Sequence, residues 1–151
     1  MATVEVTFTP LPAHVRTARL VATAVARRSG VDEALLDEVR LAVGEACSRA
    51  VEAHRRHCPA EPVKIEMTDQ GERFVVVVSD QAPTGNAAMG GATTGANGRG
   101  VATVVQGADD AGIPAGFGLA VISGLADDVR VSSTTSGVSV RMSWPSATPA
   151  G

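Results

Sequence analysis

The stretch VRLAVGEACSRAVEAHRR, residues 39–56, decides the fold and raises the question of function. Its apolar residues recur with the 3.6-residue period of a helix, in which successive residues turn by about 100°. This period places Val39, Val43 and Ala46 on one stripe, and Glu45 and Arg49 on a second, polar stripe. A helix of this kind packs one face into a core and presents a polar face that can hold a site.

Composition and charge limit the class of protein. The chain has 151 residues, of which 44% are hydrophobic and 19% charged, as expected for one globular domain with one core. Thirteen basic and 16 acidic residues give a net charge of -3, which offers no general electrostatic attraction to nucleic acid or to an anionic membrane. The N-terminus lacks the pattern of a signal peptide, and no apolar run reaches the roughly 20 residues of a membrane helix. We therefore expect a cytoplasmic protein that binds neither nucleic acid directly nor a membrane.

The cysteines and histidines predict no metal centre. Cys47 and Cys58 are too few and too close together for a disulfide framework or a zinc site, so we expect reduced thiols, with Cys47 packed in the core. His14, His54 and His57 lack a defensible metal-ligand spacing, and we expect them at the surface or at helix ends.

The hydrophobic pattern predicts an α+β domain over residues 1–144. Strands are expected over 3–8, 63–69, 73–80, 129–133 and 137–144, and helices over 13–30, 33–56 and 116–128. Because the strands cluster instead of alternating with helices, they fit one mixed, mostly antiparallel sheet with the helices on one face, which is a two-layer sandwich.

Two segments fall outside this pattern. Residues 81–112 are rich in Gly, Ala, Thr and Asn and have no sustained period, so we expect a flexible, lid-like loop or disorder. Residues 145–151 are expected to form a disordered tail.

Three features are expected to border one cleft: the polar face of the helix over 33–56, Asp80 at a strand end, and Gly116 and Gly118 at a helix start. The free backbone N–H groups at a glycine-flanked helix N-terminus form an anion site. The expected ligand therefore carries a phosphate.

Three segments resemble the sequence boxes of a known family. RLAVGEACSRAV (40–51), VVVVSDQAP (75–83) and AGFGLAVISGLADDVRV (115–131) are similar to the N-box and the first and second glycine boxes of the anti-sigma factor serine/threonine protein kinases. These kinases belong to the GHKL, or histidine-kinase-like ATPase, superfamily. The resemblance covers residues 3–144 and implies a Bergerat-type ATP-binding fold. It also implies a bacterial homodimer that binds a sigma factor and phosphorylates a STAS-domain anti-anti-sigma factor.

The resemblance also implies roles for individual residues. Glu45 matches the N-box acid that activates the attacking hydroxyl, and Asp80 matches the aspartate that reads the adenine amino group. Gly116 and Gly118 match the glycines that wrap the phosphates. Arg49 occupies the position of the asparagine that holds Mg²⁺ in the family.

Arg49 departs from the family pattern in a way that changes the chemistry. A guanidinium has five donors and no acceptor, so it cannot ligate Mg²⁺, although it can contact a phosphate directly. Glu45 and Arg49 are spaced i, i+4, which predicts an ion pair that occupies the carboxylate and makes it a poorer general base. Ala82 and Thr84 replace the glycines of the first glycine box and restrict its backbone.

These departures leave three hypotheses. The favoured one is an anti-sigma-factor-like regulator of a partner-switching system, a pseudokinase whose ATP binding and kinase activity are weakened or lost. The first alternative is an active ATP-dependent serine kinase in which Arg49 contacts phosphate. The second, from another class, is a GHKL-like ATP-binding enzyme or sensor unrelated to sigma factors. In the simplest interpretation, Glu45 and Arg49 form only a solvated pair and Asp80 is a turn residue.

The first predicted helix carries candidate partner-binding residues. In the family an arginine of this helix contacts both the sigma factor and its antagonist, and Arg19 falls at that position when counted back from the N-box without a gap. Arg16 lies one turn earlier, on the same predicted face. The alternative is that both are solvated helix arginines.

Overall fold

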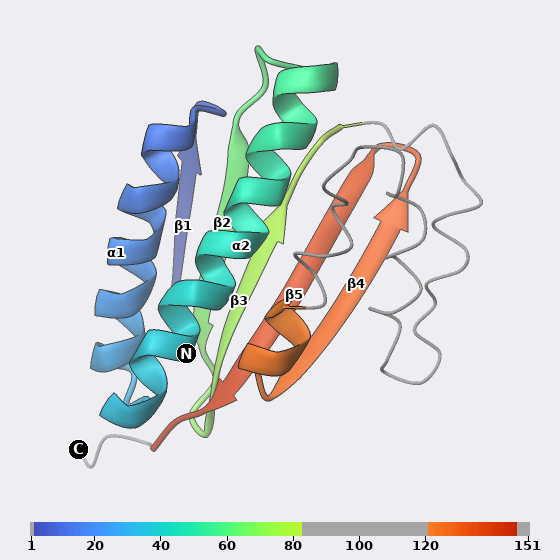
Figure 1. The fold of residues 1–151 in the computed structure, drawn as a ribbon. Coiled ribbons are helices and arrows are strands. Elements are labelled where there is room, and N and C mark those ends of the chain that lie inside the picture. The colour runs from blue at the N-terminus through green and yellow to red at the C-terminus, as the bar shows by residue number, and fades with distance from the viewer. Residues whose placement is uncertain (1, 83–120, 148–151) are drawn as a thin grey trace.

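The computed structural model describes residues 2–82 and 121–147. Its elements are β1 (Ala2–Phe8), α1 (Pro12–Arg28), α2 (Glu33–His57), β2 (Val63–Asp69), β3 (Arg73–Ser79), β4 (Asp128–Thr134) and β5 (Gly137–Pro145). Both long helices lie on one face of a single sheet (Figure 1). The predicted α+β class, with helices on one face, is confirmed. None of the described helices combines the length and apolar character that would let it span a bilayer.

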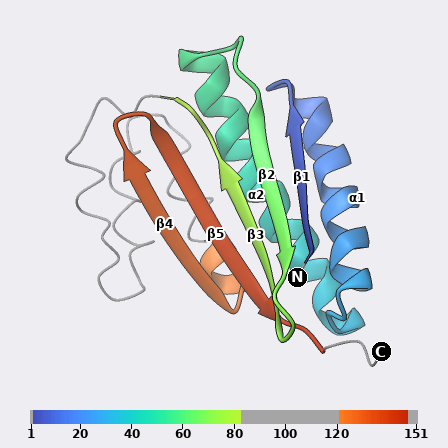
Figure 2. The same cartoon turned by 180° about the vertical axis from the view of Figure 1, so that it is seen from behind.

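The five strands form one sheet in the order β1-β2-β3-β5-β4, so the valine-rich strand β3 is central, as Figure 2 shows from the side opposite to the helices. Each of the four described pairings is antiparallel. The predicted mixed sheet is therefore wholly antiparallel in these residues. The β2–β3 and β4–β5 pairs are hairpins, as the turn residues predicted.

The predicted element bounds agree closely with the structure. The strand over 63–69 is reproduced, and α2 extends one residue beyond the predicted 33–56. Residues 121–125 are helical, within the predicted helix 116–128. Residues 116–120, including Gly116 and Gly118, and most of the predicted lid over 81–112 lie outside the described ranges.

Asp32 caps the N-terminus of α2, and its side chain accepts a hydrogen bond from the backbone N–H of Ala34 at 2.9 Å. Glu33 in the first turn and Arg55 and Arg56 in the last turn both complement the helix dipole. These local signals explain why α2, the longest of the described helices, starts and ends as the sequence predicts.

The chain end after β5 is joined to the turn between the two helices. The backbone N–H of Ala147 donates to the Gly30 carbonyl at 3.0 Å. Gly30 has a φ of +92°, and a Cβ at this position would overlap the Ala147 carbonyl oxygen. Ala147 is therefore hydrogen-bonded to the domain, although it belongs to the segment 145–151 that was expected to be a disordered tail.

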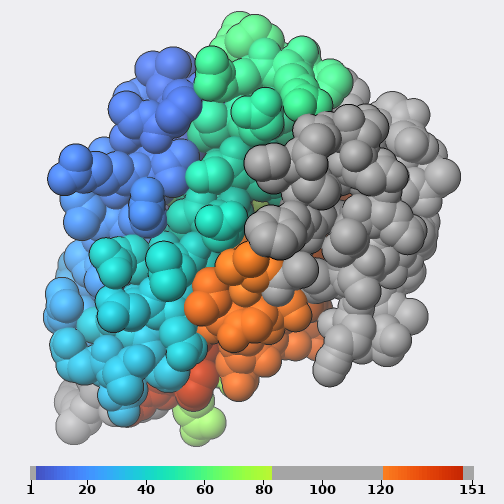
Figure 3. All heavy atoms as spheres, viewed as in Figure 1, coloured from blue at the N-terminus to red at the C-terminus, as the bar shows by residue number. Residues whose placement is uncertain are grey.

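The core lies between the helix layer and the inner face of the sheet. Trp144, Phe74, Ile65 and Met67 are the largest buried side chains from the strands, and α2 contributes the small buried residues Val39, Val43, Ala46 and Ala50. Cys47 is fully buried as predicted. Small side chains on α2 let this helix lie close to the strands, and Figure 3 shows α1 and α2 packed side by side on the same face of the molecule.

Candidate functional site

Arg49 and Asp80 form a buried ion pair between the middle of α2 and the end of β3. Both terminal nitrogens of Arg49 donate to Oδ2 of Asp80, at 2.8 and 3.0 Å. The side chain of Arg49 is 13% exposed and that of Asp80 only 1%. Two of the predicted site residues are therefore in contact, but they bind each other where both were expected to contact a ligand.

The second carboxylate oxygen of Asp80 is also occupied. Oδ1 accepts hydrogen bonds from the backbone N–H groups of Ala82 and Val138, each at 3.1 Å. A carboxylate offers about four lone-pair sites. With two N–H donors on each oxygen, Asp80 has no acceptor left over for a ligand.

Backbone contacts hold Asp80 against the start of β5. Its N–H donates to the Val138 carbonyl at 2.9 Å. The neighbouring Gly137 has a φ of +152°, and a Cβ there would overlap the Asp80 carbonyl oxygen. Only glycine fits both this backbone conformation and this close approach.

The predicted pair between Glu45 and Arg49 is wrong. Glu45 is exposed and forms no ion pair with any residue in the described ranges, because Arg49 turns towards the sheet and binds Asp80. Charges attract more strongly in the poorly solvated interior than at the surface of a helix. Burial lowers the pKa of Arg49 and the Asp80 carboxylate opposes that shift, so the guanidinium remains a cation.

His54 extends the polar cluster along α2. Its Nε2 accepts a hydrogen bond from the Gln81 backbone N–H at 2.8 Å, and its Nδ1 lies 2.8 Å from the Glu61 carbonyl oxygen. Since a carbonyl only accepts, Nδ1 carries the proton and the ring is neutral. His54 thereby joins the last turn of α2 to the residue after Asp80.

His54 lies in the last turn of α2, in agreement with the expected helix-end position, but its full burial was not predicted. The helical period could have predicted the burial of His54, because this residue lies four residues after buried Ala50 and seven after buried Cys47, on the same face of α2.

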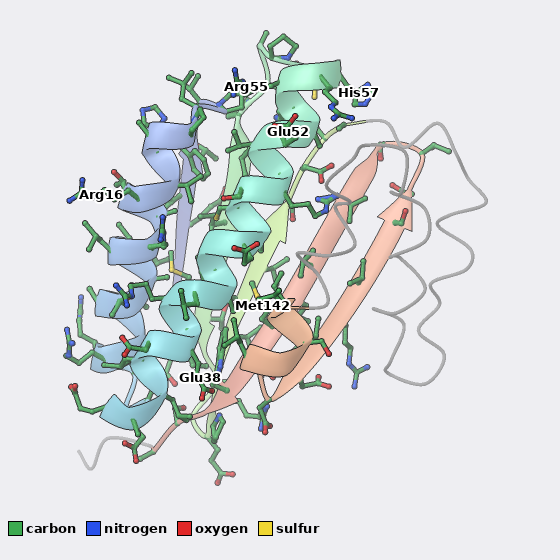
Figure 4. All side chains as sticks on the ribbon, viewed as in Figure 1. Arg16, Glu38, Glu52, Arg55, His57 and Met142 are labelled. Carbon is green, nitrogen blue, oxygen red and sulfur yellow. The ribbon has the colours of Figure 1, made fainter. Side chains whose placement is uncertain are left out.

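The two candidate partner-binding arginines differ in environment. Arg16 is exposed and projects outward from α1 (Figure 4). Arg19 packs across α2 at Gly44, where a Cβ would lie 2.8 Å from the Arg19 Cδ atom. The Arg19 Nε atom is buried and has no hydrogen-bond partner among the described residues. Gly44 thus makes room for Arg19.

The described residues contain no group of three or more His, Cys, Asp or Glu side chains arranged to hold a metal ion. Asp80 is paired with a cation of the chain itself, and Glu45, on the exposed side of α2, forms no ion pair with another described residue. Gly116 and Gly118, the predicted phosphate-binding glycines, lie outside the described ranges.

Comparison with known proteins identifies the class. Residues 8–144 match the family described as the histidine kinase-like ATPase domain, and the chain belongs to this family. This part of the predicted resemblance is confirmed.

One solved structure with a similar fold contains the RsbU and RsbW domains of Rv1364c from Mycobacterium tuberculosis, with a TM-score of 0.63 and 16% sequence identity. The match covers 99% of this chain and 34% of that one, so the chain spans about a third of its length. At this identity the likeness concerns the fold. A search of curated proteins finds no match.

Proposed function

We propose that this protein is a regulator of a partner-switching system that binds a STAS-domain anti-anti-sigma factor, a sigma factor, or both. We further propose that its nucleotide site is closed by the Arg49–Asp80 pair, so that it does not act as a kinase. The observation that carries the proposal is the complete occupation of the Asp80 carboxylate by N–H donors of the chain.

An adenine amino group needs an acceptor, and Asp80 can provide one only if Arg49 leaves. Separating a buried ion pair typically costs about 3–5 kcal/mol, because it leaves an uncompensated charge. Micromolar binding corresponds to about 8 kcal/mol. Displacement of Arg49 would therefore consume roughly half of the free energy of such a complex.

The described residues also do not fit the magnesium ion that accompanies ATP in this family. Arg49 has no acceptor atom, and its positive charge repels a divalent cation placed beside it. Glu45, the family's catalytic acid by resemblance, is exposed and has no positioning partner among the described residues. Both observations support a binding function over phosphoryl transfer.

Partner binding is supported by α1. Arg19 is partly exposed and packs against Gly44 of α2, which fixes its side chain at the surface, where the exposed part of its guanidinium can meet a partner's carboxylate. Exposed Arg16 lies one turn away on the same helix. The fold likeness to a structure that contains an RsbW domain agrees with this interpretation.

The test combines two measurements on the purified chain. Calorimetric titration with Mg-ATP should give no binding heat, and association with a purified STAS-domain protein should be the same with ATP, without ATP and with EDTA. Magnesium-dependent ATP binding in the micromolar range, or phosphate transfer to a serine of the STAS domain, would establish the active-kinase alternative. Absence of binding to STAS-domain proteins and sigma factors alike would refute the partner-switching role.

A further inference from the structure

A polar cleft lies on the face of the sheet opposite the helices, at the end where β5 stops and β3 and β4 begin (Figure 2). Its volume is about 440 Å³, within the range of small-molecule sites. Val75 and Ser143 form its base. Their neighbours Val76 and Met142 belong to the core, so the alternation of side chains along a strand directs the base away from α1 and α2. Asp80 follows the other end of β3, and the cleft is therefore separate from the candidate site described above.

Hydrogen bonds hold one wall of the cleft in place. The Nη2 atom of Arg73 donates to Oδ2 of Asp127 at 2.8 Å and to Oγ of Ser143 at 2.7 Å. The backbone N–H of Asp127 donates to the Ser143 carbonyl at 3.0 Å. The base of the cleft and two of its charged side chains are thus fixed relative to one another by contacts within the chain.

Arg141 is the charged residue of the cleft that lacks a counterion. The other arginines nearby have partners: Arg73 pairs with Asp127, and Arg130 pairs with Asp128. Among the described residues, the side chain of Arg141 forms neither an ion pair nor a hydrogen bond. Arg141 also lies directly opposite Arg130 on the neighbouring strand, and like charges at such positions repel. An anion bound by Arg141 would use its free donors and reduce this repulsion.

The carboxylates of the cleft restrict the kind of anion. Asp127 and Asp128 line the same cleft, and their side chains are 54% and 41% exposed, so both can act on a bound molecule despite their ion pairs. A dianion such as phosphate, placed beside Arg141, would face these two negative charges. A molecule with a single carboxylate and a nearby ammonium group matches charges of both signs.

The strand register brings the two signs close together. Arg141 is paired with Arg130 and Ser143 with Asp128, so Arg141 and Asp128 occupy diagonal positions on the same face of the sheet. Diagonal neighbours are separated by roughly 7–8 Å, a distance that the long arginine side chain can shorten. The carboxylate and ammonium groups of an α-amino acid share one carbon atom, and they therefore need opposite charges that lie this near to each other.

We propose that this cleft binds a free α-amino acid. Arg141 holds the carboxylate through parallel N–H donors, and the ammonium group lies on the side of Asp127 and Asp128. The side chain of the amino acid extends over Val75 towards Gln70, where the cleft has room for a long side chain. This inference goes beyond the proposed function and does not depend on whether ATP or a STAS-domain protein binds.

Amide-detected NMR titrations of the purified chain test the proposal, with each standard L-amino acid added in turn. At least one amino acid should cause saturable shifts in the millimolar range at the amides of Val75, Asp128 and Arg141, because an open cleft leaves its charges partly screened by solvent. Two analogues of that amino acid, one without the ammonium group and one without the carboxylate, should each bind roughly tenfold more weakly or not at all.

Side-chain variants locate the site. Arg141→Gln should raise the dissociation constant of the same amino acid roughly tenfold or more, since it removes the partner of the carboxylate. Asp128→Asn should raise it several-fold. Arg28→Gln is the matched control, because Arg28 is exposed at the end of α1, on the other side of the sheet, and should leave the dissociation constant unchanged. The amide spectrum of each variant shows whether it is folded.

Four results would overturn the proposal. The first is the absence of saturable binding by every standard amino acid to the wild type. The second is equal affinity for the amino acid and for its analogue without the ammonium group, and the third is tighter binding of inorganic phosphate at these amides, since both describe a simple anion site. The fourth is an affinity that a folded Arg141→Gln variant leaves unchanged.

Discussion

Both terminal nitrogens of Arg49 bind one oxygen of Asp80, although 31 residues separate the two in sequence. The contact joins the middle of α2 to the end of the central strand. A buried ion pair adds little net stability compared with an apolar replacement, but removal of one partner leaves an isolated charge in the interior. The pair is therefore best studied by changing both members.

We expect Asp80→Asn and Arg49→Met each to destabilise the protein by about 3–5 kcal/mol, because each leaves the other member without its counter-charge. The double variant should lose clearly less than the sum of the two. Urea unfolding of the four proteins gives the coupling free energy. Additive losses would show that the two side chains do not interact in solution.

Cys47 should make the protein sensitive to alkali. Burial raises the pKa of its thiol from 9.0 to about 12, and nearby Arg19 opposes the shift only in part. The native chain therefore holds a proton that the unfolded chain has released, so stability is retained below about pH 9 and lost as the pH rises towards 12. For one titrating group, the free energy of unfolding falls by at most about 1.4 kcal/mol per pH unit.

The sequence suits this measurement because it has no tyrosine and a single lysine, Lys64, so few other groups titrate in that range. Urea unfolding between pH 8 and 11 should give a falling stability for the wild type and a flatter profile for Cys47→Ala. The matched variant Cys58→Ala should keep most of the slope. Equal slopes in the wild type and Cys47→Ala would contradict the buried neutral thiol.

His54 should stabilise the segment after β3 through its two hydrogen bonds. His54→Leu removes its two part-buried hydrogen bonds, to the Gln81 N–H and the Glu61 carbonyl, and each such bond contributes about 1 kcal/mol. His54→Gln should cost less, since its amide can still accept from Gln81. Thermal unfolding measures both losses.

His57→Gln is the control for this comparison, because His57 is exposed on the same helix and its replacement should stay within about 0.5 kcal/mol. If all three variants unfolded at the wild-type temperature, the His54 contacts would have no energetic importance.

Arg19→Ala should weaken binding of a STAS-domain partner by at least tenfold while leaving the circular dichroism spectrum intact, as expected for a central interface arginine. Gly44→Ala should weaken it as well, because the new Cβ would displace the Arg19 side chain from its position 2.8 Å away. Arg28→Ala, at the exposed end of α1, should bind as the wild type does. Unchanged affinity for Arg19→Ala would remove this residue from the interface.

The fold was predictable because its signals are local. The helical period of α2, its Asp32 cap and the turn residues of the two hairpins depend on neighbours in sequence, and each agrees with the structure. The partner of Arg49 was not predictable in this way. The i, i+4 rule describes solvated helix surfaces, whereas the inner position of Arg49 follows from the packing of α2 on β3.

Asp80 was correctly expected at a strand end. That its carboxylate is fully hydrogen-bonded within the chain depends in part on the Val138 N–H of strand β5, which is distant in sequence. Long-range backbone contacts of this kind leave no trace in local sequence. His54, in contrast, could have been placed in the core from its spacing to Ala50 alone.

The cation that neutralises Asp80 is a side chain of the protein, Arg49, and not a bound ion. A guanidinium that belongs to the chain is always present beside Asp80, whatever the supply of small molecules. We therefore expect the protein to adopt the same shape in a starved cell and in a growing one, insensitive to the ratio of ATP to ADP. If it exchanges partners as proposed, the exchange would follow the abundance of the competing proteins alone.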